Sequence, residues 1–333
     1  MKLRRGEAIF RDVRMADALM CHQHLSISVF AVILSSLLSV FLVITLGWAL
    51  RRYMLPDPQS WIALERITYF ALNPVLIFLS VVKVDLASIP LLKLSGALLG
   101  TLATLTLLLV WGRNLLQKAL STDGPGYTSL FQGIIRWNGF IALAVAGSIL
   151  GTRGIALVSV AMGIMIPVIN VISVSVLKRH GNSSGSVLKS VVTNPFVISG
   201  VLGLLFNLLA IPLPKMVESS LSIIGQCALG CGLIVVGAGL HLEQLRRPSP
   251  ALVGGTLLRL IGAPLIAFGL ARALNLPPDI TQAVVICFGV PTAANAYLLA
   301  RQMGGDAPLM AAIITAQTIA CLATLPLLLF VLA

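Results

Sequence analysis

The stretch Phe288-Gly289-Val290-Pro291-Thr292-Ala293-Ala294-Asn295 lies in the middle of an apolar run over residues 279–300. A run of this length can cross the hydrocarbon core of a bilayer as a helix. Pro291 removes a backbone donor and clashes with the preceding turn, so we expect the helix to open there. Opened backbone is tolerated at membrane depth only where it faces protein or a wet cavity. The stretch predicts a broken helix with a substrate site formed by Gly289, Pro291, Thr292 and Asn295.

A second polar cluster, Arg136-Trp137-Asn138-Gly139-Phe140, interrupts the apolar run at 127–150. Gly139 weakens a helix through its backbone freedom. Arg136 lies roughly 14 Å into the run, at ~1.5 Å per helical residue, and an intramembrane Arg indicates a functional site. We therefore add Arg136, Asn138 and Gly139 to the predicted site. Two alternatives stay open: an internally satisfied proline kink at Pro291, and an Arg136 that binds helix-end carbonyls or reaches toward the cytoplasm.

The succession of apolar runs predicts an all-α integral membrane protein with ten transmembrane helices. The central loop at 178–189 separates five spans from five, and an odd number per half gives the halves opposite orientations, as in inverted-repeat transporters. We predict a first five-helix repeat at 28–177 and a second at 190–333, with broken fourth and ninth helices crossing near the midplane. The spans are placed near residues 28–50, 60–82, 90–112, 127–150, 154–177, 187–210, 216–240, 249–273, 279–300 and 307–332.

The composition excludes a soluble enzyme, because 58% of the residues are hydrophobic and only 10% are charged, against roughly a quarter in an ordinary soluble domain. The net charge of +12 does not indicate a nucleic-acid partner, since Lys and Arg lie in short loops, where they set membrane orientation. Loops after odd-numbered spans carry ten of them and the opposite loops carry five. This predicts a cytoplasmic central loop and both termini outside, in a multi-pass protein of the cytoplasmic (inner) membrane.

The N-terminal tail at 1–27 disagrees with this orientation, because its own basic residues would level the count. The tail is poor in apolar residues and contains two further methionines. We expect translation to begin at Met15 or Met20, so that the preceding part of the tail is not translated.

The sequence gives no sign of a metal, a cofactor or a catalytic group. The five cysteines have no CxxC spacing and the four histidines have no metal-ligand spacing. No pairing of a nucleophile with a base is present. The expected partners are therefore the lipid bilayer and a small-molecule substrate.

The deep charges in the predicted spans are positive. Arg259 is a second deep cation, whereas the 11 acidic residues lie in the tail, in loops or near span ends. This favours a carboxylate-bearing substrate, because a cation pump or proton relay usually needs an intramembrane Asp or Glu. The alternative is that Arg259 pairs with Glu65 or with backbone carbonyls and never meets substrate.

Over residues 28–333 the chain resembles the auxin efflux carrier family, which belongs with the bile-acid/sodium symporter-like superfamily. The residues that carry the resemblance are Arg51-Arg52, Asn73-Pro74, Phe78, the cluster at 136–140, Asn194-Pro195, Asn207, Ile211-Pro212-Leu213-Pro214, Pro291-Thr292-Ala293-Ala294-Asn295-Ala296-Tyr297 and Gly304-Gly305-Asp306.

The resemblance implies two inverted repeats, a crossover of the fourth and ninth helices at the substrate site, an elevator-like transport domain, and a scaffold able to form a homodimer. It also implies small carboxylates such as malate or malonate, or an auxin-like acid, as substrates, with Asn138 and Asn295 as the paired crossover asparagines. Relatives commonly have a proline shortly after the first of these, and residues 141–145 contain none. The fourth-span break is then expected to be shallower and to rest on Gly139 alone.

We therefore expect a secondary transporter that moves a small organic anion by alternating access. Asn138 and Asn295, with backbone groups near Gly139 and at 289–292, would bind the carboxylate in the positive field of Arg136. Sodium- or proton-coupled symport stays open. So do a channel and a sensor, although the polarity is clustered rather than continuous and the central loop is too short for an output domain.

Overall fold

The computed structural model describes residues 34–35, 37–85, 88–178, 194–246, 248–293 and 295–332. Within these ranges the chain is helical with short connections and forms no strand. The predicted tail at 1–27 lies outside the described residues, and so does the predicted central loop beyond Lys178.

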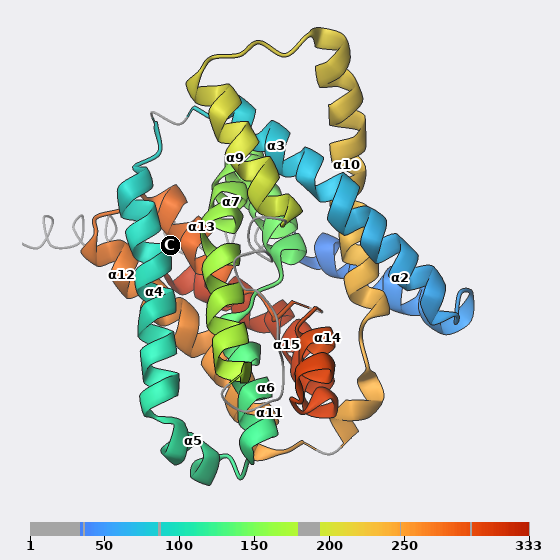
Figure 1. The fold of residues 1–333 in the computed structure, drawn as a ribbon, viewed down its shortest axis with the longest axis vertical. Coiled ribbons are helices and arrows are strands. Elements are labelled where there is room, and N and C mark those ends of the chain that lie inside the picture. The colour runs from blue at the N-terminus through green and yellow to red at the C-terminus, as the bar shows by residue number, and fades with distance from the viewer. Residues whose placement is uncertain are drawn as a thin grey trace, which may run out of the picture.

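Helices follow one another along the described chain (Figure 1). A first helical stretch covers residues 37–53. The other α-helices are α2 (Pro58–Ile67), α3 (Asn73–Lys83), α4 (Leu91–Trp111), α5 (Arg113–Ala119), α6 (Gly124–Ile135), α7 (Gly139–Lys178), α9 (Pro195–Leu208), α10 (Lys215–Ala238), α11 (Pro250–Leu257), α12 (Ala263–Ala273), α13 (Pro278–Gly289), α14 (Asn295–Met303) and α15 (Ala307–Leu332). Two π-helices, η1 (Thr68–Leu72) and η4 (Leu258–Gly262), and a 3-10 helix, η3 (Leu242–Arg246), complete the set.

Among the described residues, six helical segments are long and apolar enough to cross a membrane. Two shorter apolar helices, α9 and α13, accompany them. The predicted all-α membrane fold is thus supported, while the count of ten spans and the inverted relation of the two halves stay predictions. The six segments are Pro58–Lys83, Leu91–Trp111, Gly124–Leu177, Lys215–Ala238, Pro250–Ala273 and Ala307–Leu332.

Two of these segments contain a π-helical turn directly before a proline. η1 precedes Asn73-Pro74, and η4 precedes Ala263-Pro264. Proline lacks an N–H and clashes with the carbonyl four residues earlier, so the helix is relieved by one wider turn. In both cases the first N–H after the wide turn donates to the carbonyl five residues before it. The second of these turns carries Arg259.

Small residues let the helix at 37–53 approach α10 closely. A Cβ atom on Gly237 would lie 1.8 Å from the carbonyl oxygen of Ile44, and one on Gly47 would lie 2.1 Å from that of Ile234. Only hydrogen fits at either position, which is the usual way in which membrane helices achieve close backbone contact. Arg51 also ties this helix to α10, because its Nη1 donates to the carbonyl oxygen of Ala238.

The helices form two groups that meet along α7 (Figure 1). In one group, α3 packs against α9 and α10. In the other, α12 packs against α4 and α13, while α15 packs against α6 and α13. α7 consists of two helices that meet at a kink at Gly151 (φ 62°, ψ −149°). Because it contacts α3, α9 and α10 as well as α4 and α13, it forms the boundary at which the candidate site is found.

Candidate functional site

The fourth predicted span is broken at three consecutive residues. α6 ends at Ile135, residues 136–138 are non-helical, with Arg136 in an extended conformation (φ −75°, ψ 151°), and α7 begins at Gly139. The expectation that the break rests on Gly139 alone was wrong, because Asn138 starts the new helix by capping it. Its Oδ1 accepts from the N–H groups of Phe140 at 3.1 Å and Ile141 at 3.2 Å.

Gly139 has a steric role instead. A Cβ atom at this position would lie 2.6 Å from the terminal methyl carbon of Met162 on α7. The absence of a side chain at Gly139 therefore lets α7 begin in close contact with the side chain of Met162.

The ninth predicted span is broken as the sequence predicts. α13 ends at Gly289, Val290 is extended (φ −79°, ψ 157°), and α14 begins at Asn295. Residues 290–293 between these helices form no helix. The opening predicted at Pro291 is confirmed.

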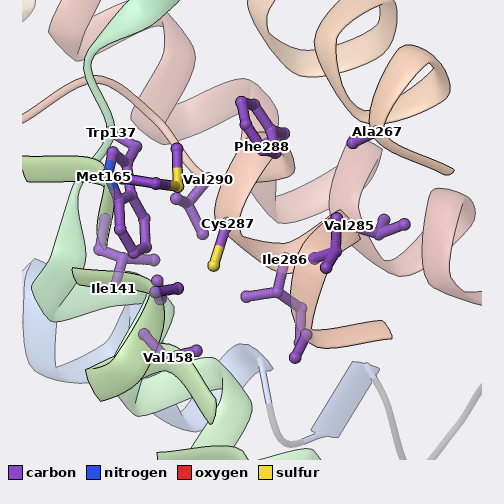
Figure 2. Close-up of a cluster of buried hydrophobic side chains, with 14 of the residues drawn as sticks. Trp137, Ile141, Val158, Met165, Ala267, Val285, Ile286, Cys287, Phe288 and Val290 are labelled. Atoms are coloured by element: carbon purple, nitrogen blue, oxygen red, sulfur yellow. The ribbon is translucent and has the colours of Figure 1, made fainter. Parts of the chain in front are cut away.

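The two breaks lie against each other. The N–H of Asn138 donates to the carbonyl oxygen of Pro291 at 2.8 Å. The hydroxyl of Thr292 donates to the carbonyl oxygen of Gly133 at 2.5 Å. Figure 2 shows Trp137 and Ile141 in the same buried apolar cluster as Cys287, Phe288 and Val290. Segments far apart in the sequence thus form one crossover.

A glutamine on α15 holds this crossover together. Gln317 is fully buried, and its Nε2 donates to the carbonyl oxygens of Gly133 at 2.9 Å and Gly255 at 3.3 Å. Its Oε1 accepts from the N–H of Thr292 at 2.8 Å. One side chain therefore links α6, α11 and the segment after α13.

Arg259 is the second side chain that binds the crossover from behind. Its guanidinium donates to backbone carbonyls of the α6 and α13 ends, and its exposed fraction is 0%. It does not line the cavity described next. Of the two readings of Arg259 from the sequence, the one with backbone carbonyl partners is correct.

A cavity of about 450 Å³ opens on the other side of the crossover, between the two groups of helices. The first residues of both half-helices line it: Asn138, Gly139 and Phe140 around the start of α7, and Asn295 at the start of α14. Helix N-termini carry partial positive charge and unsatisfied N–H groups, which favour anions. Opposite them, residues of α2, η1, α9 and α10 complete the wall.

Arg136 supplies the full positive charge in this wall. Its Nη2 donates to Oδ1 of Asn170 at 3.1 Å, while its Nη1 is buried and has no partner among the described residues. Oδ1 of Asn295 is also buried without a partner in the described part of the chain. Buried polar groups are normally satisfied, and a charged donor left unpaired is costly. Each of the two breaks therefore contributes one lining residue with a buried polar atom that has no partner in the described ranges.

Four of the seven predicted site residues line the cavity: Arg136, Asn138, Gly139 and Asn295. The other three lie at the crossover behind it and do not line it. Pro291 and Thr292 join the two breaks, and the carbonyl oxygen of Gly289 accepts from Sγ of Cys321 at 3.6 Å. A direct role of these three residues in binding stays a prediction.

Most other lining residues were not predicted from the sequence, among them the polar residues Glu65, Tyr69, Asn170 and Asn194. Glu65 was read as a span-end charge, and Asn170 is a lone amide inside the apolar run at 154–177. The hydroxyl of Tyr69 accepts from Nδ2 of Asn194, the residue that caps α9. An isolated polar residue in an apolar run was the available signal, but nothing in the sequence shows which of them share a cavity.

Groups of three His, Cys, Asp or Glu side chains able to hold a metal ion do not occur in the described ranges. The polar groups of the lining residues are amides, one guanidinium, one carboxylate, the hydroxyl of Tyr69 and the indole N–H of Trp137, together with the helix N-termini. Such a set can bind and release a small polar molecule.

Comparison with known proteins identifies the family of the chain. A family described as membrane transport protein matches residues 32–329, which include both breaks. An uncharacterized transporter of Methanothermobacter thermautotrophicus is 27% identical over 308 residues, covering 88% of this chain and 96% of the relative. The chain therefore belongs to the membrane transport protein family, the family of the auxin efflux carriers, and is a membrane transporter rather than an enzyme.

Proposed function

We propose that the protein is a secondary transporter of a small organic anion across the cytoplasmic membrane. The observation that carries this proposal is the cavity in which two half-helix N-termini meet Arg136, with one of its guanidinium nitrogens unpartnered among the described residues. In broken-helix transporters, half-helix N-termini point at anionic groups of the substrate.

In this proposal a substrate carboxylate accepts from the free Nη1 of Arg136 and from donors of Asn138 and Asn295. A charge-assisted bond of this kind contributes about 1.5–3 kcal/mol. The body of the substrate lies against the aromatic side chains of Tyr69, Trp137 and Phe196 in the cavity wall.

The charges of the cavity favour a monocarboxylate, including an auxin-like acid, over a dicarboxylate such as malate or malonate. Arg136 is the one Lys or Arg side chain among the described lining residues, and Glu65 adds a negative charge. A second carboxylate would therefore meet repulsion without a cation of its own.

Alternating access would come from movement of the group that carries the crossover against the group that contains α2, α3, α9 and α10. The cavity lies between these groups, so such a movement would change the side from which it is reached. This corresponds to an elevator mechanism with an α3–α9–α10 scaffold through which a homodimer could form. In the same proposal, both chain termini lie on the outer side of the membrane.

Solid-supported-membrane electrophysiology on proteoliposomes tests the proposal, with lactate, indole-3-acetate, malonate and malate as substrates. We expect a saturable current with a monocarboxylate and a loss of at least tenfold in Arg136→Gln, since a charged hydrogen bond contributes about 10–100-fold in binding. Arg272→Gln, on the exposed end of α12, is the control that keeps full current. Equal currents in Arg136→Gln and the wild type, from folded protein, would contradict the proposed site.

A uniporter and a cation symporter are the two forms this function could take. An anion that leaves the cell down the membrane potential gains ~2.3 kcal/mol per 100 mV. The crossover bonds identified above are made by backbone, amide, hydroxyl, thiol and guanidinium groups, with no carboxylate among them. This favours uniport, which the same recording tests by removal of the sodium gradient.

A further inference from the structure

The α6 and α13 half-helices both end inside the protein, next to each other. The last carbonyls of a helix have no partner within it, and its C-terminus carries about half a negative charge. Two such ends placed together form an electronegative site in a region from which water is excluded. Figure 2 shows Cys287, Phe288 and Val290 at the end of α13, within the buried cluster.

Arg259 fills this electronegative site. Its Nε donates to Val290 O at 2.9 Å, its Nη1 to Ile134 O at 3.0 Å, and its Nη2 to Cys287 O at 2.9 Å. The guanidinium also lies 6.0 Å from the ring centroid of Phe288. One cation thus neutralises both half-helix ends.

The pairing of Arg259 is unusual because it involves no acid. The ion pairs found among the described residues are Lys83–Glu218, Arg153–Asp279 and His241–Glu243, all of them elsewhere. A buried charge normally requires a compensating partner. Here the compensation comes from backbone dipoles, which is how a protein commonly holds a bound metal cation.

The other carbonyls at the crossover are occupied too. Gly133 O accepts from Thr292 and Gln317, and Pro291 O accepts from the N–H of Asn138. The five crossover carbonyls named here therefore all have protein donors. Each of these oxygens already accepts at least one hydrogen bond, which leaves fewer lone pairs for a mobile cation.

In transporters with broken helices, half-helix C-terminal ends and unwound carbonyls coordinate the coupling cation. We propose that the guanidinium of Arg259 is a built-in cation that takes this place, and that its removal opens a binding site for a monovalent metal cation, Na⁺ or K⁺. The inference rests on the proposed function, since it assigns the cation-coupling position of the same crossover. According to this inference, the wild-type carrier needs no metal cation at the ends of α6 and α13.

The experiment measures thermal unfolding of purified protein in detergent, so it needs no knowledge of the substrate. NaCl and KCl are titrated against choline chloride at equal ionic strength. We expect no specific response in the wild type. Arg259→Ala should melt at a lower temperature in choline, and saturating Na⁺ or K⁺ should raise its melting temperature by about 3–6 °C, as a ligand present at many times its Kd does.

Two further variants make the result specific. Arg259→Lys keeps a positive charge with donors at the site, so it should show no metal response. Arg272→Ala removes an exposed arginine from the same membrane segment and should also show none. A metal response in either variant equal to that of Arg259→Ala would overturn the proposal, because the effect would not arise from the vacated position.

Radioactive ²²Na⁺ binding to the wild type keeps the proposal testable if Arg259→Ala does not fold in any salt. We expect the wild type to show no saturable binding of ²²Na⁺. Saturable binding to the wild type that is lost in Arg259→Lys would place a metal cation beside Arg259 and overturn the proposal. Failure of the two proposals is distinguishable. Anion currents that require Na⁺ would refute the proposal that Arg259 is a built-in cation and would leave the proposed anion transport standing. A metal response in Arg259→Ala without any anion current would support the role of Arg259 and contradict the proposed anion transport.

Discussion

The backbone N–H of Asn138 donates to the carbonyl oxygen of Pro291 across 2.8 Å, and this bond joins the start of α7 to the segment that follows α13. Because it is made by backbone atoms, no substitution of either side chain except proline at 138 removes its donor. It ties the start of α7 to the non-helical segment that precedes α14. In the proposed function, a substrate carboxylate would contact both half-helix N-termini.

The two crossover asparagines should respond differently to truncation. Oδ1 of Asn138 caps α7 through two N–H groups, whereas Oδ1 of Asn295 has no partner in the described chain. Asn138→Ala should lower both transport and stability, the latter by about 1 kcal/mol for a lost cap. Asn295→Ala should lower transport at nearly unchanged stability. Thermal unfolding and anion currents of both variants measure the difference.

Asn138→Asp separates capping from binding. It keeps a carboxylate oxygen that can cap α7 but places a negative charge in the cavity, so stability should be retained while anion transport falls. Asn138→Ser, which caps without charge, is the matched control and should transport better than Asn138→Asp. The opposite order would show that Asn138 does not face the anion.

Gln317→Leu should destabilise the protein strongly. The substitution leaves the buried N–H of Thr292 without the acceptor it has now, whereas the carbonyl oxygen of Gly255 keeps the N–H of Leu258 as a donor. Unsatisfied buried groups of this kind cost about 1–3 kcal/mol each. Chemical or thermal unfolding measures the loss, and Gln59→Leu on the exposed start of α2 should leave stability nearly unchanged. A stable Gln317→Leu would mean that the crossover does not depend on this link.

Gly237→Ala should disrupt the contact between α10 and the helix at 37–53. The added methyl would lie 1.8 Å from a backbone oxygen of Ile44, which cannot rotate away. Overpacking of this kind costs about 1–3 kcal/mol. Gly230→Ala on the same helix is the control, because its methyl would meet nothing within 4 Å. Similar melting temperatures for the two variants would contradict the close packing seen here.

Glu65→Gln should strengthen the binding of an anion. Glu65 lines the same cavity as Arg136, so its negative charge opposes a bound carboxylate. Removing one like charge at the distances of a small cavity should lower KM by about 3–10-fold. Anion currents as a function of substrate concentration measure KM, with Glu218→Gln, which lies in a different pocket, as the control. Loss of transport in Glu65→Gln would instead indicate that this carboxylate takes part in coupling.

Much of the architecture follows from local sequence. Long apolar runs have to be helical in a bilayer, where backbone groups must bond within their own segment. Pro291 predicted the ninth-span break for a similarly local reason, since its ring and missing N–H disfavour a continuous helix, although Pro167 and Pro326 lie inside α7 and α15. In the structure, Asn194 caps α9 and Pro195 is its first residue, inside the span that the sequence placed near residues 187–210.

The details of the site were not available from such local rules. The position of the fourth-span break depends on the cap formed by Asn138 and on the space left by Met162, neither of which is visible in the spacing of residues. Glu65 and Asn170 read as ordinary isolated polar residues until the cavity brings them to Arg136.

Local sequence was sufficient to predict a multi-pass helical protein with two interrupted segments, because hydrophobic length and proline chemistry act over a few neighbouring residues. Which of the two deep arginines lines the cavity depends on how the helices pack. Arg136 and Arg259 are chemically identical and both lie in apolar runs. Their roles differ because Arg259 reaches the carbonyl ends of α6 and α13, which only long-range packing brings together. Arg136 lies in the short segment between α6 and α7 and lines the cavity.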